Sequence, residues 1–224
     1  MVIHIIKYII SILALIILLV FGVLFSVIKL YDKEIKDIAL KQINNQLISP
    51  MIIQNIELSA FNYFPAISLQ FSNLLIKDPL ANNDTLLFAK NAFLNFDAYD
   101  LINKKYIVRK LVLKNGSLAA KVSTDGKENF DVFISKDKSE NNNFKFSLEQ
   151  LTLKDFSVNY QNIPLRQQYD FTISDSKLKG QFSNQEYDLN ILSSMSVNKF
   201  DLEGVNYISS KHAKTEIIFQ VTND

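Results

Sequence analysis

The residues that could do chemistry in this chain are few, and their spacing does not assemble a reaction centre. Close pairs of carboxylates occur at Asp97 with Asp100 and at Glu186 with Asp188, a residue type that general acid–base catalysis uses. The spacing places no histidine, serine or lysine beside either pair, and carboxylates at loop edges are ordinarily solvated. We therefore predict no catalytic site and no enzyme activity.

The segment DGKENFD, residues 125–131, has the composition of a calcium loop but not its spacing. An EF-hand needs glycine at the sixth position and a late glutamate, whereas here Gly126 is second, so a hairpin turn is favoured. His4 lies beside an apolar N-terminal segment, and His212 lies in a polar stretch where we expect it to be exposed. The sequence predicts no metal site and no cofactor.

Composition narrows the function classes further. The chain has 224 residues, a formal net charge of +1, 48% hydrophobic residues and no cysteine. Nucleic-acid binding needs clustered Lys and Arg, so the near-neutral balance gives no reason to expect it. The absence of cysteine excludes disulfides and thiolate metal sites and is compatible with either an oxidising or a reducing compartment.

The stretch Tyr8–Ile28 holds no charged residue and no proline. A helix of about twenty such residues crosses a hydrocarbon core about 30 Å thick. No small-residue cleavage site follows it, as a secretory signal would require. We predict that residues 1–30 form an uncleaved transmembrane anchor, because a buried helix of a soluble core would usually show a polar face.

The charges that flank this stretch bear on its orientation. Lys7 alone precedes it, whereas Lys29, Lys33, Lys36 and Lys41 follow it. By the positive-inside rule, this distribution favours a cytoplasmic location for the downstream part.

Residues 31–49 are predicted to form a juxtamembrane amphipathic helix. Apolar residues such as Ile35, Ile43 and Leu47 fall near one stripe, and Ser49-Pro50 ends the pattern. Such a helix would lie at the membrane interface or close one end of a sheet. A solvated helix with one packed face is an equally good interpretation.

From Met51 the hydrophobic period changes to two, which predicts β-strands. We assign residues 51–224 to one antiparallel β domain, with a hairpin turn at Asn115-Gly116, a bulge near Gln150 and a mobile loop at 135–143. Because an apolar strand pattern runs almost to Asp224, we expect this sequence to be the front part of a longer protein.

The predicted strands pose a problem of coverage, since no amphipathic helix pattern follows Pro50. A sheet with one apolar face must bury that face against something. Patterning alone favours a second sheet and hence a β-sandwich. The predicted anchor makes the other solution competitive, an elongated curved antiparallel sheet whose groove is filled by lipid.

The order of several motifs resembles the start of the AsmA-like proteins of the bacterial envelope. After the anchor come Phe64-Pro65 leading an alternating strand, the strand at 87–97, a polar interruption at 99–105 and the strands at 107–118. A DG-x-x-N-aromatic run follows, with Phe130 where tryptophan is common in the family. The resemblance covers about residues 1–133 and continues loosely to the end.

The resemblance implies a single-pass inner-membrane protein whose body stands in the periplasm, opposite to the orientation that the flanking charges favour. It also implies a hydrophobic β-groove that carries phospholipid toward the outer membrane and supports the integrity of that membrane. Envelope proteins are the expected protein partners. The alternative hypothesis is a membrane-tethered β-sandwich scaffold, or an accessory factor in outer-membrane protein assembly.

If the groove exists, one set of alternating apolar residues lines it and takes up acyl chains. Acyl chains contribute about 0.8 kcal/mol per buried methylene, so no specific headgroup contact is required. The same residues would form an ordinary core in a sandwich. The predicted lining consists of Ile56, Leu58, Ile67, Leu69, Phe71, Phe88, Leu94, Phe96, Leu111, Leu113, Leu118, Ala120, Leu151 and Leu153.

Overall fold

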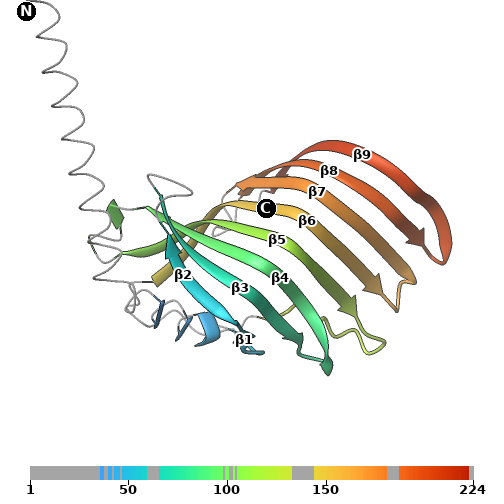
Figure 1. Ribbon diagram of the computed structural model, residues 1–224. Helices are drawn as coiled ribbons and strands as arrows, with labels where there is room; N and C mark the ends of the chain where they lie inside the picture. Colours follow the sequence, from blue (N-terminus) through green and yellow to red (C-terminus); the bar gives the residue numbers. More distant parts are fainter. Residues whose placement is uncertain are drawn as a thin grey trace, which may run out of the picture.

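Alternating apolar and polar residues downstream of Pro50 form nine strands that belong to a single curved sheet in the computed structural model (Figure 1). The structure describes residues 36–37, 40–41, 43–45, 47–59, 66–97, 99–100, 103, 105–132, 144–180 and 187–221. The strands are β1 (Met51–Ile52), β2 (Asn55–Ser59), β3 (Ala66–Asp78), β4 (Ala81–Asp97), β5 (Tyr106–Val122), β6 (Phe144–Asn162), β7 (Gln167–Gly180), β8 (Tyr187–Leu202) and β9 (Val205–Val221).

The predicted anchor at Tyr8–Ile28 and the predicted loop at 135–143 lie outside the described residues, as do His4, Phe64-Pro65, Glu186 and residues 31–35 of the predicted helix. Within the described part of the chain, no helix has the length and apolar character needed to span a bilayer.

The sheet has the order β1-β3-β4-β5-β6-β7-β8-β9, and β2 also pairs with β3. The prediction of a mainly β, curved sheet is confirmed. The described residues do not form the alternative β-sandwich, because all their strands belong to this one sheet. The predicted bulge near Gln150 is present, since β5 and β6 shift register between Val108 and Lys110, opposite Phe146 and Gln150.

The prediction of a fully antiparallel sheet is wrong at one pair, because β5 and β6 run parallel. A tight hairpin forces antiparallel pairing, whereas a connection of a dozen or more residues allows the chain to return to the start of the previous strand. β5 ends at Val122 and β6 begins at Phe144, which leaves a connection of this longer kind. The sheet is therefore mixed.

The predicted hairpin at Asn115-Gly116 is also wrong, because β5 continues through both residues. Asn115 has a φ of 53° within the strand, in the left-handed region that asparagine tolerates better than most residues. The sequence feature that suggests a turn here serves as a local kink in an unbroken strand.

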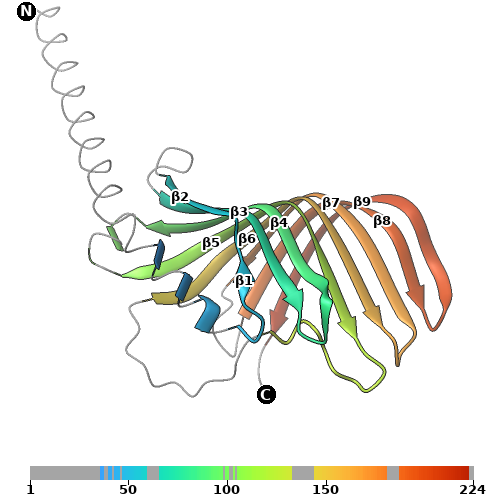
Figure 2. The ribbon, with the colours of Figure 1, turned by 60° about the horizontal axis from the view of Figure 1, so that its bottom comes forward.

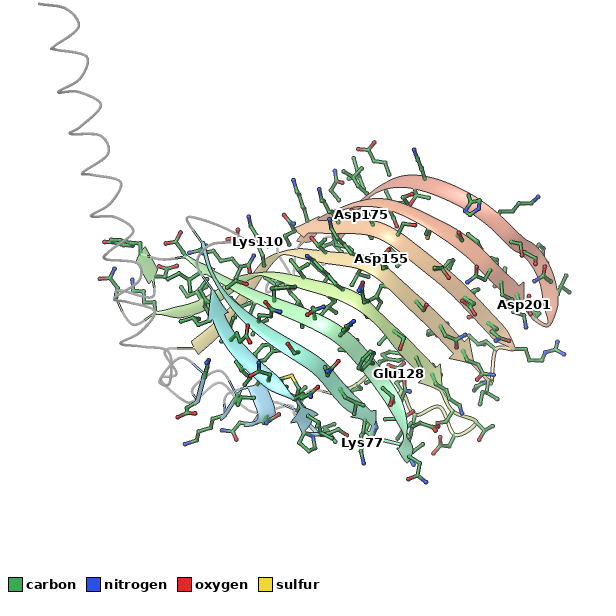
Figure 3. The ribbon with its side chains drawn as sticks, viewed as in Figure 1. Lys77, Lys110, Glu128, Asp155, Asp175 and Asp201 are labelled. Carbon is green, nitrogen blue, oxygen red and sulfur yellow. The ribbon has the colours of Figure 1, made fainter. Side chains whose placement is uncertain are left out.

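Asn115 belongs to a row of kinks that crosses the sheet. Asn73 on β3 has a φ of 52° and Asp155 on β6 has a φ of 50°. The neighbouring pairs place both in line with Asn115, since Ser72 pairs with Asn91, Asn91 with Lys114, and Lys114 with Lys154. In Figure 3, Asp155 lies near the middle of its curved strand, so the row runs along the bend of the sheet.

At each kink the apolar side chains shift from odd-numbered to even-numbered positions of the strand. On β3 the buried residues are Ile67, Leu69 and Phe71 before Asn73, but Leu74 and Ile76 after it, and all five belong to one core. On β6 the core-facing residues are the half-buried Leu151 and Leu153 before Asp155, then the buried Phe156 and the half-buried Val158. Successive side chains in a strand point to opposite faces, so the left-handed residue is what keeps the apolar face continuous.

This role makes a prediction for Asp155, whose side chain is exposed. Asp155→Ala is expected to lower the free energy of unfolding by about 1–2 kcal/mol, because alanine adopts the left-handed conformation at that cost. Asp155→Gly should be neutral or slightly stabilising, and Ser157→Ala, at an exposed position outside the kink, should be neutral. Chemical denaturation of the three variants checks this, and equal stability of Asp155→Ala and Asp155→Gly would contradict it.

The described helical residues, 36–37, 40–41 and 43–45, cover part of the apolar face (Figure 2). Ile43 and Leu47 are buried in the same core as β3 and β4, and Leu40 packs against that core. Asn44 accepts a hydrogen bond at 2.9 Å from the backbone N–H of Met51, which fixes the turn into β1. Among the described residues of the segment predicted as a helix, Leu40, Ile43 and Leu47 therefore pack on the sheet.

Candidate functional site

The face of the sheet that carries Leu111, Leu113 and Leu118 on β5 is here called the inner face, and the face that carries Lys110, Val112 and Lys114 is the outer face. Cross-strand partners share a face, so the register assigns the other strands. Leu111 pairs with Leu94 and with Leu151, and Leu118 pairs with Leu87 and with Val158. The inner face is thus a continuous apolar surface over the central strands.

A cavity of about 190 Å³ lies between the inner face and the helical segment before β1. All its lining side chains are apolar, and they come from the helical segment as well as from β1, β3, β4 and β5. An apolar cavity of about 150 Å³ stays dry and accepts a molecule the size of benzene, so this one is large enough for a short length of hydrocarbon chain. The lining residues are Ile43, Leu47, Met51, Phe71, Leu74, Ile76, Leu87, Ala92, Leu94, Leu111 and Leu113.

Burial of the inner face decreases from this cavity toward β9. Ile67 on β3 is completely buried and Ile173 on β7 is 8% exposed, whereas Ile208 and Ile217 on β9 are 40% and 38% exposed. The register places both β9 residues on the inner face, through Phe200 and Ile191 of β8. The apolar surface therefore begins in a covered cavity and opens to solvent at the far edge of the sheet.

Hydroxyl groups interrupt the apolar surface in one row. Ser176 on β7 pairs with Leu153 and with Ser193, and Ser193 pairs with Thr215 on β9. Among the described residues, the hydroxyl of Thr215 is buried without a hydrogen-bond partner. A hydrocarbon chain on β7–β9 would run to either side of this row, where the partners are apolar.

Aromatic rings line the half of the inner face beyond the kinks. Tyr160, Tyr169 and Phe200 occupy neighbouring positions on β6, β7 and β8, with ring centroids 5.6 Å and 4.7 Å apart in stacked arrangements. Phe130 of the β5–β6 connection packs on Tyr160 at 6.3 Å. Such pairs add stability beyond the area they bury, and they give this half a rigid apolar wall.

The structure brings most of the predicted lining residues to the inner face, at different distances from the cavity. Phe71, Leu94, Leu111 and Leu113 line the cavity itself. Ile67, Leu69 and Phe96 are buried in the same core, against which Ile56, Leu58, Leu118, Leu151 and Leu153 pack. Ala120 shares this face because it pairs with Tyr160, two residues beyond the pair of Leu118 with Val158.

Phe88 lies on the other face. It pairs with Leu75 and Ser117, while its neighbour Ala89 is completely buried in the core and Leu87 lines the cavity. The prediction placed Phe88 with Ala92 and Leu94 by counting in twos, but the pattern shifts between Asn91 and Ala89. The same shift hid Leu87, and a shift at Asn73 on β3 hid Leu74 and Ile76. For β3, the left-handed tendency of asparagine is the signal that could have revealed it.

Of the carboxylate pairs considered for chemistry in the sequence, Asp97 and Asp100 have structural roles, whereas Glu186 lies outside the described residues. Asp97 accepts hydrogen bonds from the backbone N–H groups of Tyr99 and Asp100, and Asp100 forms an ion pair with Arg109 at 2.9 Å. Hydrogen bonds with Asp100 and Glu149 raise the pKa of Arg109. None of these residues lines the cavity.

The segment at 125–131 begins with the predicted turn. The backbone N–H of Gly126 donates to Ser123 at 3.0 Å, and Val122 bridges to Glu128. A hydrogen bond with Lys127 holds the pKa of Asp125 well below its usual range. His212 is exposed, as predicted, and its Nδ1 lies 2.8 Å from the hydroxyl of Ser196.

Comparison of the chain with protein-family models, with curated proteins and with solved structures finds no significant match. The resemblance to the AsmA-like proteins accordingly stays a prediction.

Proposed function

We propose that this chain is a membrane-anchored, non-enzymatic protein that holds phospholipid acyl chains on the inner face of its sheet. The observation that carries the proposal is the cavity of about 190 Å³, whose lining is entirely apolar. It continues into an apolar surface that opens toward β9. An apolar surface of this kind favours an apolar occupant, and the cavity volume is large enough for a short length of hydrocarbon chain.

The proposed setting is the bacterial cell envelope. The apolar stretch Tyr8–Ile28 supports an inner-membrane anchor, and the motif order that resembles the AsmA-like proteins supports a periplasmic body. In that setting the protein would contribute to lipid transport to the outer membrane and to the integrity of that membrane. The scaffold alternative was built on a sandwich, and the single described sheet gives it no separate support.

Acyl-chain retention can be tested with two variants of the full chain. The full chain is needed because Ile43 and Leu47 form part of the cavity wall. Leu111→Glu introduces a charge into the wall, and Ala92→Leu fills the cavity without a charge. Each should lower retained phospholipid about tenfold or more, because losing contact with two methylenes at about 0.8 kcal/mol each already exceeds 1.4 kcal/mol.

Ser117→Glu is the matched control, since it adds the same charge on β5 at an exposed position of the outer face. Its retained phospholipid, measured by mass spectrometry after purification, should equal that of the parent chain. Circular dichroism reports whether each variant keeps its sheet. Unchanged lipid in a folded Ala92→Leu variant would overturn the proposal.

A further inference from the structure

The outer face carries a second hollow, of about 280 Å³, on the opposite side of the sheet from the apolar cavity. Its lining comes from four adjacent strands and is mainly polar, unlike that of the cavity. The lining residues are Asn95, Lys110, Val112, Lys114, Gln150, Thr152, Lys154 and Lys177.

The register places four lysines around Thr152 at the floor of this hollow. Thr152 pairs with Val112 on β5 and with Lys177 on β7. Lys110 and Lys114 stand on either side of Val112 on the outer face, and Lys114 pairs directly with Lys154. Neighbouring strands lie about 4.8 Å apart, so the four lysines extend from one small region of the outer face.

Without a bound anion, this arrangement of lysines lowers the stability of the sheet. Like charges directly opposite each other destabilise a strand pair, which applies to Lys114 and Lys154. Asp175 forms an ion pair with Lys154 at 3.3 Å, and Lys114 lies 4.9 Å from the ring centroid of Phe93. The nearby Arg109 and Glu149 pair with each other at 2.7 Å. Among the described residues, the four lining lysines thus outnumber the one carboxylate that pairs with them. Figure 3 shows Lys110 and Asp175 toward the same end of the sheet.

Two buried polar side chains form the floor. Thr152 and Asn95 are each 4% exposed, and both line the hollow. Gln150 donates to the Thr152 hydroxyl oxygen at 2.9 Å, so the hydroxyl hydrogen of Thr152 is left to donate elsewhere. Ser68 donates to Oδ1 of Asn95 at 2.7 Å, which leaves the Nδ2 donor end of that amide on the other side. Hydrogen-bond donors at the floor and ammonium groups at the rim suit an oxyanion.

We propose that this hollow binds a phosphate group, with Lys110, Lys114, Lys154 and Lys177 supplying charge and Thr152 and Asn95 supplying hydrogen-bond donors. The proposal goes beyond acyl-chain binding, because it concerns the opposite face and needs no apolar ligand. The phosphate belongs either to the headgroup of an anionic phospholipid or to a free phosphate, and the experiment separates these sources.

Lysine footprinting of the full chain in neutral detergent micelles tests the proposal. An amine-reactive acylating reagent is applied with no probe, with inorganic phosphate, or with phosphatidylglycerol mixed into the micelles, and labelling is read by mass spectrometry. At a probe concentration ten times its dissociation constant, labelling of Lys110, Lys114 and Lys177 should slow about tenfold, because the free fraction falls as 1/(1 + [L]/Kd). Lys211 on β9, outside the hollow, is the internal control and should label unchanged.

The Thr152→Val variant keeps every lysine and nearly the same side-chain shape but removes the hydroxyl donor. It therefore distinguishes a specific site that needs this donor from nonspecific attraction of anions by the lysine charges. It should lose most of the protection, while circular dichroism reports an intact sheet. Protection by phosphatidylglycerol and not by inorganic phosphate would assign the site to a lipid headgroup, and protection by both would assign it to phosphate itself. The proposal is overturned if neither probe protects, if Lys211 is protected equally, or if a folded Thr152→Val variant retains full protection.

Loss of this site would leave lipid retention on the inner face intact. Lys110→Gln with Lys177→Gln should abolish the protection of Lys114 without changing the phospholipid retained in the apolar cavity. Conversely, Ala92→Leu should leave the footprint unchanged. The two proposals can therefore fail independently.

Discussion

Replacing Asn129 by alanine is expected to lower the free energy of unfolding by about 3–5 kcal/mol, because three side-chain hydrogen bonds are lost and one of their partners, the Asp78 carboxylate, stays buried. Asn129 is 1% exposed and joins two distant parts of the sheet. Its Oδ1 accepts from the backbone N–H of Lys121 at 2.7 Å, and its Nδ2 donates to the Ala119 carbonyl at 3.0 Å and to Asp78 at 2.7 Å.

The bond to Asp78 makes the largest contribution. Asp78 is 5% exposed at the β3–β4 turn, where its other oxygen accepts from the backbone N–H of Leu80 at 2.8 Å. Removing a hydrogen bond from a buried carboxylate costs more than removing one between neutral groups. Asn129 also holds the start of the connection that lets β6 run parallel to β5.

Asn83→Ala is the matched control, since Asn83 is exposed on β4 and its loss should change stability by less than about 0.5 kcal/mol. Equilibrium denaturation of both variants provides the measurement. A double-mutant cycle of Asn129→Ala with Asp78→Ala should give a coupling of about 1–3 kcal/mol. Near-additive losses, or an Asn129→Ala variant as stable as the parent, would show that this contact does not hold the connection.

Gly116→Ala is expected to cost about 3 kcal/mol, at the upper end of the usual range for overpacking. A Cβ at Gly116 would clash with the carbonyl oxygen of Phe88 and would lie 2.5 Å from Cε2 of Phe156 and 2.9 Å from Cα of Ala89. Two of these three atoms belong to the backbone of β4, so relief requires the paired strands to separate. The Phe156 ring, which is 1% exposed, packs over the position that the missing side chain leaves open.

A companion substitution distinguishes the two clashes. Gly116→Ala combined with Phe156→Leu removes the contact with the ring but not the contact with the Phe88 carbonyl, so it should recover little stability. Gly204→Ala is the control, because its added Cβ meets nothing within 4 Å and it costs only the strain of a φ of 82°. That cost is about 1–2 kcal/mol. If Gly116→Ala proved no more damaging than Gly204→Ala in thermal unfolding, the close packing of β4 and β5 would be refuted.

The strands and their apolar faces could be predicted because alternation is a local signal. Ile67, Leu69 and Phe71 repeat in twos, and so do Leu111 and Leu113, and the structure buries them on one face. The predicted alternation fails at the row of kinks, where the apolar residues shift by one position along the strand. Asn115-Gly116 has the composition of a tight turn, and only the neighbouring strands decide whether the chain turns there or continues. Phe88 was placed on the wrong face for the same reason.

The parallel pairing of β5 and β6 could not be predicted from periodicity, because parallel and antiparallel strands alternate alike. What decides it is the path of the connection, which Asn129 ties to Asp78 over fifty-one positions of sequence. The helix before Pro50 was predicted with its apolar stripe, and closing one end of a sheet was one of the positions predicted for it, but periodicity does not determine which strands it contacts. Ile43 and Leu47 contribute to the cavity wall, so the cavity is a product of tertiary packing.

The most direct test of the account is to ask which face of the sheet touches a lipid chain. A photoreactive benzophenone side chain is placed at Val158 or at Asn159, neighbouring half-buried positions of β6 that point to opposite faces. The full chain is illuminated in phospholipid vesicles, and lipid adducts are measured by mass spectrometry. Adducts at Val158 and not at Asn159 are the predicted result. Equal adducts at both positions, or adducts at Asn159 alone, would contradict acyl-chain binding on the inner face.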